Sequence, residues 1–259
     1  MSEVEFLDVG GRRLECRRIG PPPDQAPTLV FLHEGLGCVS MWRDFPDRLS
    51  AATGWGALVY SRPGYGTSDA CALPRPLTYM HDEARTTLPG LLRAANVRDA
   101  VLVGHSDGAS IAIIAAGEGN CPGLRGLVLE APHVFCEELS VRSIAAAAKA
   151  YEEGDLRRRL MRHHGANVDC AFWGWNRAWL DPRFCQWNIE EFLPGITVPA
   201  LVIQGMDDEY GTMAQVRAVE AKIGGLVEVV TLENCRHSPH RDRADAVLQS
   251  MAAFIRRFG

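Results

Sequence analysis

Short apolar runs recur along the chain, and segments with helical spacing of apolar residues separate them. Each run is brief and almost free of polar side chains, as expected for a strand that is buried on both faces of a sheet. The runs cover residues 28–32, 57–60, 100–103, 126–130, 200–204 and 226–232. Their alternation with helical segments predicts an α/β fold, in which helices flank a mostly parallel β-sheet.

The segments around this core have their own patterns. Residues 4–9 and 13–19 are strand-like and flank Gly10 and Gly11, which predicts an opening hairpin. Helical spacing predicts helices over 41–52, over 78–95 with a break or a start near Pro89, and over 244–258.

The alternation stops between residues 132 and 194, where no strand-like run occurs. Helices are predicted instead over 140–153 and 155–164, which end at Gly154 and Gly165. We therefore expect a helical cap, residues 132–195, inserted into one core domain that residues 1–131 and 196–259 form together.

The run 100–103 leads directly into the pattern Gly-x-Ser-x-Gly, with Ser106 at its centre. Small apolar residues follow and predict a helix. A strand, a sharp turn and a helix in this order form a nucleophile elbow, which holds the serine hydroxyl out of a strained turn. Gly104 and Gly108 remove side chains where strand and helix would collide. The backbone N–H of Asp107 is then a candidate donor to an oxyanion.

Two further residues complete a candidate catalytic triad with Ser106. Asp208 and His237 each follow a predicted strand, so all three should meet at the carboxyl edge of the sheet. A serine needs a base to remove its proton, and the base needs a carboxylate to orient it. Asp207 and His240 are neighbouring alternatives for the acid and the base.

These motifs resemble those of the α/β-hydrolase superfamily over almost the full length of the chain: His33-Glu34-Gly35, the loop from Arg62 to Ser68, the elbow, the helical insert, Gly-x-x-Asp and the late histidine. The resemblance implies that Ser106 is the nucleophile, Asp208 the acid and His237 the base. It also implies that the N–H groups of Glu34 and Asp107 form the oxyanion hole.

The chain departs from common forms of the superfamily at two positions. Arg236 stands where a glycine usually precedes the histidine, and we expect it to form a salt bridge with Asp207 or Glu209. Glu34 places a carboxylate beside a developing oxyanion, which would oppose catalysis at low dielectric. Its side chain must point away, be paired, or bind a cationic or hydroxyl-bearing part of the substrate. We expect pairing, with Arg62 or Arg236.

Aromatic residues are the candidates for the wall of a substrate pocket. The insert is rich in them, and they can either bury the insert against the core or face a substrate. The candidates are Trp42, Trp173, Trp175, Trp179 and Tyr210.

Composition narrows the range of partners. The chain has 259 residues and a net charge of -5, which argues against nucleic acid or an anionic membrane as the main partner. Its eight cysteines show no metal-type spacing, and no apolar leader or stretch of ~18 apolar residues occurs. We expect a cytoplasmic protein with a small-molecule substrate and no cofactor or metal, and leave self-association open.

A serine nucleophile favours attack on an acyl carbon. The leading interpretation is a serine hydrolase that cleaves a small carboxylic ester, thioester or lactone through an acyl-enzyme. Two alternatives stay open. One is a hydrolase of a carbon–carbon bond in a diketone, which uses the same triad, and the other is a hydrolase-fold receptor that binds a ligand without turnover.

Overall fold

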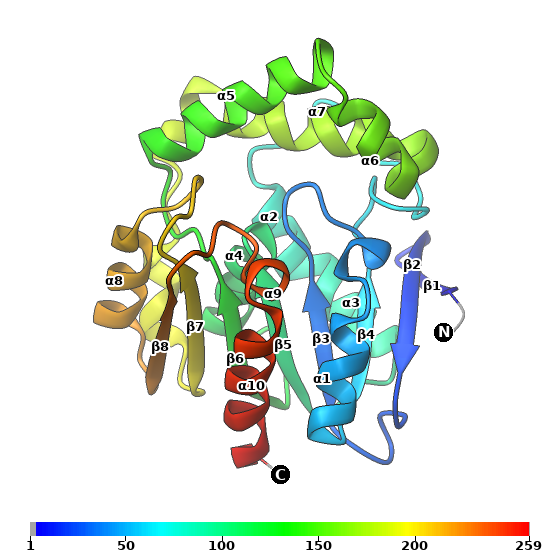
Figure 1. The fold of residues 1–259 in the computed structure, drawn as a ribbon. Coiled ribbons are helices and arrows are strands. Elements are labelled where there is room, and N and C mark those ends of the chain that lie inside the picture. Colours follow the sequence, from blue (N-terminus) through cyan, green and yellow to red (C-terminus); the bar gives the residue numbers. More distant parts are fainter. Residues whose placement is uncertain (1–3, 259) are drawn as a thin grey trace.

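The computed structural model describes residues 4–258, in which eight strands form one sheet in the order β1-β2-β4-β3-β5-β6-β7-β8 (Figure 1). The strands are β1 (Val4–Val9), β2 (Arg12–Ile19), β3 (Thr28–Leu32), β4 (Gly56–Tyr60), β5 (Ala100–His105), β6 (Leu124–Glu130), β7 (Ala200–Gly205) and β8 (Val227–Leu232). All pairs from β4 to β8 are parallel. The hairpin β1–β2 adds to this sheet in antiparallel fashion, so the predicted fold class and opening hairpin are confirmed.

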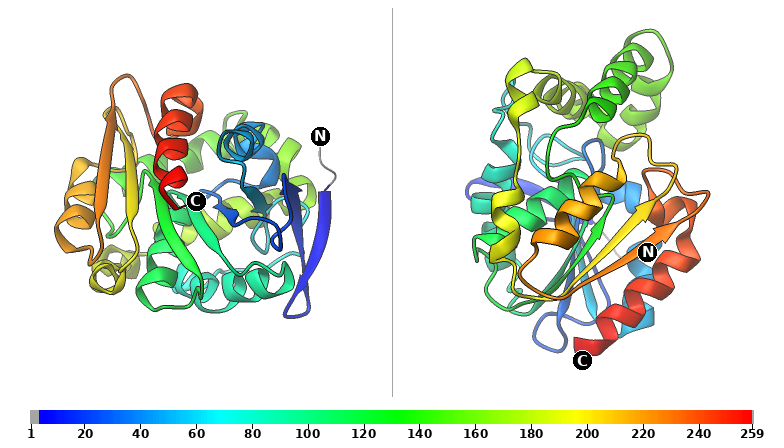
Figure 2. Two further views of the ribbon diagram at one scale, coloured as in Figure 1. Left: turned by 90° about the horizontal axis from the view of Figure 1, so that it is seen from below. Right: turned by 90° about the vertical axis from the view of Figure 1, so that its left-hand side faces the viewer.

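Helices cover both faces of the sheet. On one face lie α1 (Phe45–Thr53), α9 (Pro239–Asp242) and α10 (Ala244–Ile255); on the other lie α2 (Tyr79–Asp82), α3 (Leu88–Ala94), α4 (Asp107–Gly117) and α8 (Met213–Lys222). Figure 2 shows α8 and α10 on opposite sides of the strands. Alternate residues of β5 serve the two faces: Val101 and Val103 pack toward α10, and Leu102 packs toward α4. This two-sided burial explains the wholly apolar runs.

Two predicted helices differ in detail. The helix expected from residue 41 begins only at Phe45, after a short 3-10 turn over Val39–Trp42. Pro46 occupies its first turn, where the missing N–H costs nothing. The helix predicted over 78–95 is interrupted by a π-turn at Glu83–Thr87 immediately before Pro89, whose ring disfavours a regular helix there.

Three helices lie above the carboxyl ends of the parallel strands, and we call residues 138–179 the upper helical layer (Figure 1). They are α5 (Glu138–Glu152), α6 (Leu156–His164) and α7 (Val168–Trp179). In the sequence, the residues of this layer lie between β6 and β7. Short 3-10 turns at Gly165–Asn167, Pro182–Gln186, Glu190–Gly195 and Arg256–Phe258 complete the helical segments. Within residues 4–258, no helix combines the length and the apolar character needed to cross a bilayer.

Candidate active site

Ser106 stands at the sharp turn between β5 and α4. Its backbone adopts φ 54° and ψ −118°, a conformation that costs a non-glycine residue roughly 1–3 kcal/mol. The flanking glycines make the turn possible. A Cβ on Gly108 would lie 2.0 Å from the carbonyl oxygen of Leu32, and one on Gly104 would lie 2.5 Å from that of Gly108. The local structure therefore has the geometry of the predicted elbow.

The predicted triad residues meet at the carboxyl edge of the sheet. Ser106 Oγ lies 2.9 Å from Nε2 of His237, and Nδ1 of His237 lies 2.8 and 2.9 Å from the two carboxylate oxygens of Asp208. Asp208 follows β7, and His237 follows β8. Because Nδ1 faces a carboxylate, it carries the proton and leaves Nε2 free to accept the serine hydroxyl proton.

The surroundings of Asp208 favour its charged form. Its Oδ1 accepts the backbone N–H groups of Tyr210 (2.7 Å) and Gly211 (3.1 Å), and its Oδ2 accepts the Gln204 amide (2.7 Å). Burial by itself would raise the pKa of Asp208. The charge and hydrogen bond of His237 and the Tyr210 N–H outweigh burial, and the pKa lies below its usual range. Asp208 is therefore ionised at neutral pH.

The two neighbouring alternatives lie differently. Asp207 is exposed on the surface. His240 is buried, with Nδ1 2.8 Å from the carboxylate of Glu130 and its ring centroid 4.6 Å from that of Trp42. The geometry thus favours Asp208 and His237 as the partners of Ser106.

The two backbone N–H groups predicted to bind an oxyanion belong to residues at the cavity beside the serine. The N–H groups of Glu34 and Asp107 donate to no acceptor within residues 4–258, and both residues line the cavity that contains Ser106. Asp107 begins α4, whose positive helix end also favours an anion. The Asp107 carboxylate turns away from the cavity and accepts the Tyr79 hydroxyl at 2.5 Å, with Arg62 at 3.9 Å.

The prediction that Arg62 or Arg236 pairs with the Glu34 carboxylate is wrong. Arg62 donates to the backbone carbonyl oxygens of His33 and Glu34, each at 3.0 Å, and so holds the loop rather than the carboxylate. Arg236 pairs with Glu209 at 3.0 Å, one of its two predicted partners. The carboxylate of Glu34 lies instead 3.5 Å from Nδ1 of His105.

A cavity of about 170 Å³ opens above Ser106. Its apolar wall includes residues from α5, α7 and the loop that follows β3, which we call the oxyanion loop. Its polar side holds Ser106, His237 and two further histidines. The lining residues are Glu34, Gly35, Leu36, His105, Ser106, Asp107, His133, Ile144, Trp175, Trp179, Glu209, Tyr210, His237 and Ser238. The cavity is smaller than most ligand sites, which span roughly 300–1,000 Å³.

Three of the five aromatic candidates, Trp175, Trp179 and Tyr210, line this cavity, and two do not. Trp42 is buried on the opposite face of the sheet, with its ring edge against Phe31 at 5.1 Å. Trp173 packs inside the upper helical layer. Trp175 and Trp179 lie one turn apart on one face of α7, and Trp173 falls on another face. The expectation for Trp42 and Trp173 as pocket residues is therefore wrong.

Two histidines that line the cavity were not predicted from the sequence as site residues. His105 is the variable residue before the serine, and His133 follows the end of β6. Burial and the charge of His237 lower the pKa of His133 to about 3, so His133 is neutral. Its ring centroid lies 5.5 Å from that of His237. His133, three residues beyond the end of a buried strand, had a signal in the sequence, and His105 had none of its own.

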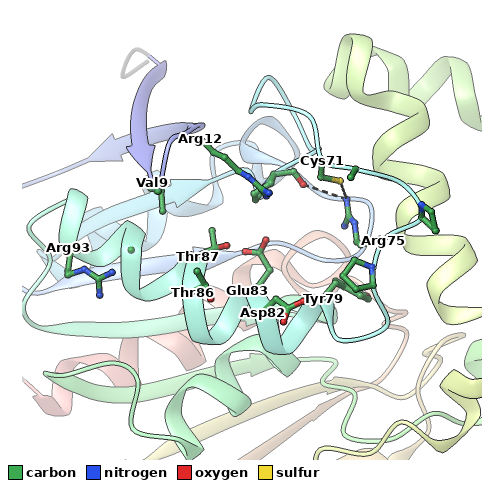
Figure 3. Close-up of a pocket in the computed structure, with 16 residues that line it drawn as sticks. Val9, Arg12, Cys71, Arg75, Tyr79, Asp82, Glu83, Thr86, Thr87 and Arg93 are labelled. Carbon is green, nitrogen blue, oxygen red and sulfur yellow. Dashed lines mark hydrogen bonds between the residues drawn. The ribbon is translucent and has the colours of Figure 1, made fainter.

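A larger cavity, of about 530 Å³, lies beyond Tyr79 and contains no member of the triad (Figure 3). We call it the second cavity; Arg12, Cys71, Arg75 and Glu83 are among its lining residues. Elsewhere, no group of three His, Cys, Asp or Glu side chains within residues 4–258 is arranged to hold a metal ion.

Comparison with known proteins places this geometry in a family. The profile described as "Alpha/beta hydrolase family" matches residues 29–250, which include the elbow, Asp208 and His237. The chain belongs to the alpha/beta hydrolase family. This membership and the arrangement of the site together support hydrolase chemistry.

Individual members of the family are similar at low identity. A 2-succinyl-6-hydroxy-2,4-cyclohexadiene-1-carboxylate synthase of Salmonella heidelberg is 24% identical over 265 aligned residues, covering 91% of this chain and 96% of the relative. The enol-lactonase from Burkholderia xenovorans has a TM-score of 0.73 at 21% identity, covering 97% of this chain and 99% of the other. The esterase EaEST from Exiguobacterium antarcticum has a TM-score of 0.76 at 18% identity, covering 98% and 99%. At these identities the solved structures show a shared fold.

Proposed function

We propose that the protein is a serine hydrolase that cleaves a small carboxylic ester, thioester or lactone through an acyl-enzyme. The observation that carries this proposal is the 2.9 Å contact between Ser106 Oγ and Nε2 of His237, with Asp208 behind the imidazole. Since Nε2 is within hydrogen-bond reach of the hydroxyl, it can take the proton as the oxygen attacks.

Acylation follows from this arrangement. Ser106 Oγ attacks the acyl carbon while its proton passes to Nε2 of His237, and the Asp208 carboxylate stabilises the resulting imidazolium. The oxyanion accepts the N–H groups of Glu34 and Asp107, and such donors each contribute roughly 3–4 kcal/mol to catalysis. His237 then gives its proton to the leaving oxygen or sulfur. Water, activated by the same imidazole, releases the acid and restores Ser106.

The size of the cavity supports a small acyl group. A volume of about 170 Å³ lies below the roughly 300–1,000 Å³ of most ligand sites. Trp175 and Trp179 supply its apolar wall, and Gly35 leaves room for the Trp175 indole directly above the oxyanion loop. We propose that residues 132–195 act as a cap, since the two tryptophans and Ile144 in this segment close the cavity.

The names of the related proteins agree with acyl chemistry in two cases. The Burkholderia and Exiguobacterium proteins are named as an enol-lactonase and an esterase. The Salmonella relative is named as a synthase, and its 24% identity supports membership of the family without favouring its substrate. The ester and lactone classes are therefore the first to test.

A panel of p-nitrophenyl acetate, butyrate and octanoate tests the proposal, with a thioester, a lactone and a diketone alongside. We expect turnover of the acetate and butyrate esters that falls toward octanoate, and loss of at least about 10³-fold in Ser106→Ala. Ser250→Ala on α10 is the matched control. Cleavage of the diketone alone, or equal rates in the wild type and Ser106→Ala, would overturn the proposal.

A further inference from the structure

Two thiols from distant parts of the chain meet where the upper helical layer contacts the core. Cys71 belongs to the loop between β4 and α2, and Cys170 belongs to α7. Their sulfur atoms lie 3.1 Å apart, and Cys170 Sγ also donates to the Cys71 carbonyl oxygen at 3.4 Å. Both side chains are half-buried. A Cβ on Gly64 would lie 2.7 Å from each sulfur, so this glycine leaves the space in which the thiols meet.

Arg75 supplies a fixed positive charge to this pair. Its Nη2 donates to Cys71 Sγ at 3.2 Å (Figure 3). Its Nη1 donates to the Tyr65 hydroxyl at 2.6 Å. The guanidinium also lies over the Tyr65 ring at 4.6 Å. Within residues 4–258, no carboxylate oxygen lies within 4.0 Å of Arg75. Cys71 is therefore the most readily ionised group that contacts this cation.

The surroundings shift the pKa values of the two thiols in opposite directions. The hydrogen bond from Cys170, together with the Arg75 charge, outweighs burial and lowers the pKa of Cys71 to about 5. Hydrogen bonding to Cys71 and burial raise the pKa of Cys170. The contact with Arg75 therefore favours the thiolate form of Cys71, while Cys170 keeps its proton. This is the arrangement of an attacking and a resolving cysteine.

Small reagents can reach Cys71 through the second cavity. Cys71 lines this cavity together with Arg12 and Arg93, and Figure 3 shows the Cys71 side chain beside Arg75 at its edge. The molecule contains a natural comparison for this pair. Cys136 has Cys185 as a neighbour, but burial raises the pKa of Cys136 to about 11. The raised pKa of Cys136 thus contrasts with the lowered pKa of Cys71.

We propose that Cys71 and Cys170 form a reactive dithiol site that a hydroperoxide oxidises to a disulfide. The Cys71 thiolate attacks one peroxide oxygen, the O–O bond breaks, and the other oxygen leaves as water or an alcohol after taking a proton. The Cys170 sulfur then attacks the sulfenic sulfur, the S–S bond forms, and the S–O bond breaks. The departing hydroxide takes the Cys170 proton as water. Two thiols and one hydroperoxide thus give one disulfide, one alcohol or water, and one further water.

The disulfide joins α7 to the core. Trp175 and Trp179 lie later on the same helix and line the cavity above Ser106. Oxidation therefore fastens the helix that supplies the apolar wall of this cavity. The dithiol chemistry itself does not depend on the proposed hydrolase activity, and the test below reads it without any ester substrate.

The test uses the reduced full-length protein, treated with hydrogen peroxide and then with N-ethylmaleimide before peptide mass spectrometry. We expect a Cys71–Cys170 disulfide to form at least about tenfold faster than a Cys136–Cys185 disulfide. In Cys170→Ser, which keeps a hydroxyl donor, we expect no disulfide and a sulfenic acid at Cys71 that dimedone traps. Equal rates for the two pairs, or peroxide consumption at other cysteines first, would overturn the proposal.

A matched pair of arginine variants tests the role of the charge. Iodoacetamide at pH 6 should modify Cys71 at least about tenfold faster than the exposed Cys185. Arg93→Met, in the same cavity but without contact to sulfur, should keep this advantage. Arg75→Met should lose most of it, with circular dichroism to show that the variant is folded and Arg75→Lys to restore part of the rate. Unchanged Cys71 reactivity in a folded Arg75→Met protein would contradict the assignment.

Discussion

The Glu34 carboxylate lies 3.5 Å from Nδ1 of His105, so an acid of the oxyanion loop pairs with the residue directly before the nucleophile. The other ring nitrogen of His105 lies 2.6 Å from the carbonyl oxygen of His237. One imidazole therefore connects the oxyanion loop, the elbow and the loop of the catalytic base. When His105 is protonated, its positive charge also reduces the repulsion that the Glu34 carboxylate would exert on an oxyanion.

Replacing Glu34 by Gln tests this pair through the pH dependence of stability. Burial would lower the pKa of His105, but Glu34 outweighs it and the pKa is raised from 6.5. Burial would likewise raise the pKa of Glu34, but His105 lowers it below 4.5. Stabilisation by His105 is complete below pH 6.5, and it is lost as the pH rises through the raised pKa of His105. Stabilisation by Glu34 is present above 4.5 and is lost as pH falls through its lowered pKa.

The pair should thus stabilise the protein most between about pH 4.5 and 6.5. We expect Glu34→Gln to cost about 1–3 kcal/mol there, or roughly 2–4 °C in Tm for each kcal/mol. The deficit should shrink as the pH is raised toward 9. Thermal melts across this range measure it, with Glu220→Gln on the exposed side of α8 as the control. A deficit that grows with pH would contradict the assignment.

Asp208 and its exposed neighbour Asp207 offer a matched pair for the role of the acid. Asp208→Asn removes the charge that stabilises the imidazolium and no longer selects the required tautomer of His237, so kcat should fall by about 10³- to 10⁴-fold at neutral pH. Asp207→Asn should stay within about twofold, because its side chain does not contact His237. Steady-state kinetics on an ester that the wild type cleaves compares the two. A larger loss in Asp207→Asn would reverse the assignment.

Trp175 should limit the length of the acyl group. Trp175→Ala enlarges the cavity above the oxyanion loop, and we expect the octanoate-to-acetate ratio of kcat/KM to rise by about tenfold, since one or two methylenes in a pocket are worth about that much. Trp173→Ala removes the same kind of side chain from the same helix but outside the cavity. The octanoate-to-acetate ratio of Trp173→Ala should stay unchanged. An equal shift in both variants would show that the helix, rather than the cavity wall, had been altered.

The helices, the strands and the candidate triad could be predicted from the sequence, because they depend on short-range patterns of residues. The run into Ser106 showed a strand, a turn and a helix, and the strand ends placed Asp208 and His237 at one edge. The partner of Glu34 depends on which side chains the folded loops bring together. His105 offered no signal of its own, since its role arises from β5 lying beside β3.

The aromatic residues show the same limit. Helical spacing on α7 separates Trp173 from Trp175, and applying that spacing would have removed Trp173 from the pocket candidates. Trp42 could not be placed in this way, because it lies in a short 3-10 turn, in which its side chain and that of Val39 are buried in the core beneath α1 and α10. The contact of Cys71 with Cys170 also joins segments far apart in the chain, and cysteine spacing gave no indication of it.

Mass spectrometry of the intact protein after reaction with a fluorophosphonate probe shows whether Ser106 is an activated nucleophile. We expect the wild type to take up one phosphonyl group, peptide mapping to place it on Ser106, and Ser106→Ala to take up none. Labelling of His237→Ala should be slower by several orders of magnitude, because the serine has lost its base. A wild type that resists the probe, or a label that persists in Ser106→Ala, would contradict the assignment of Ser106 as an activated nucleophile.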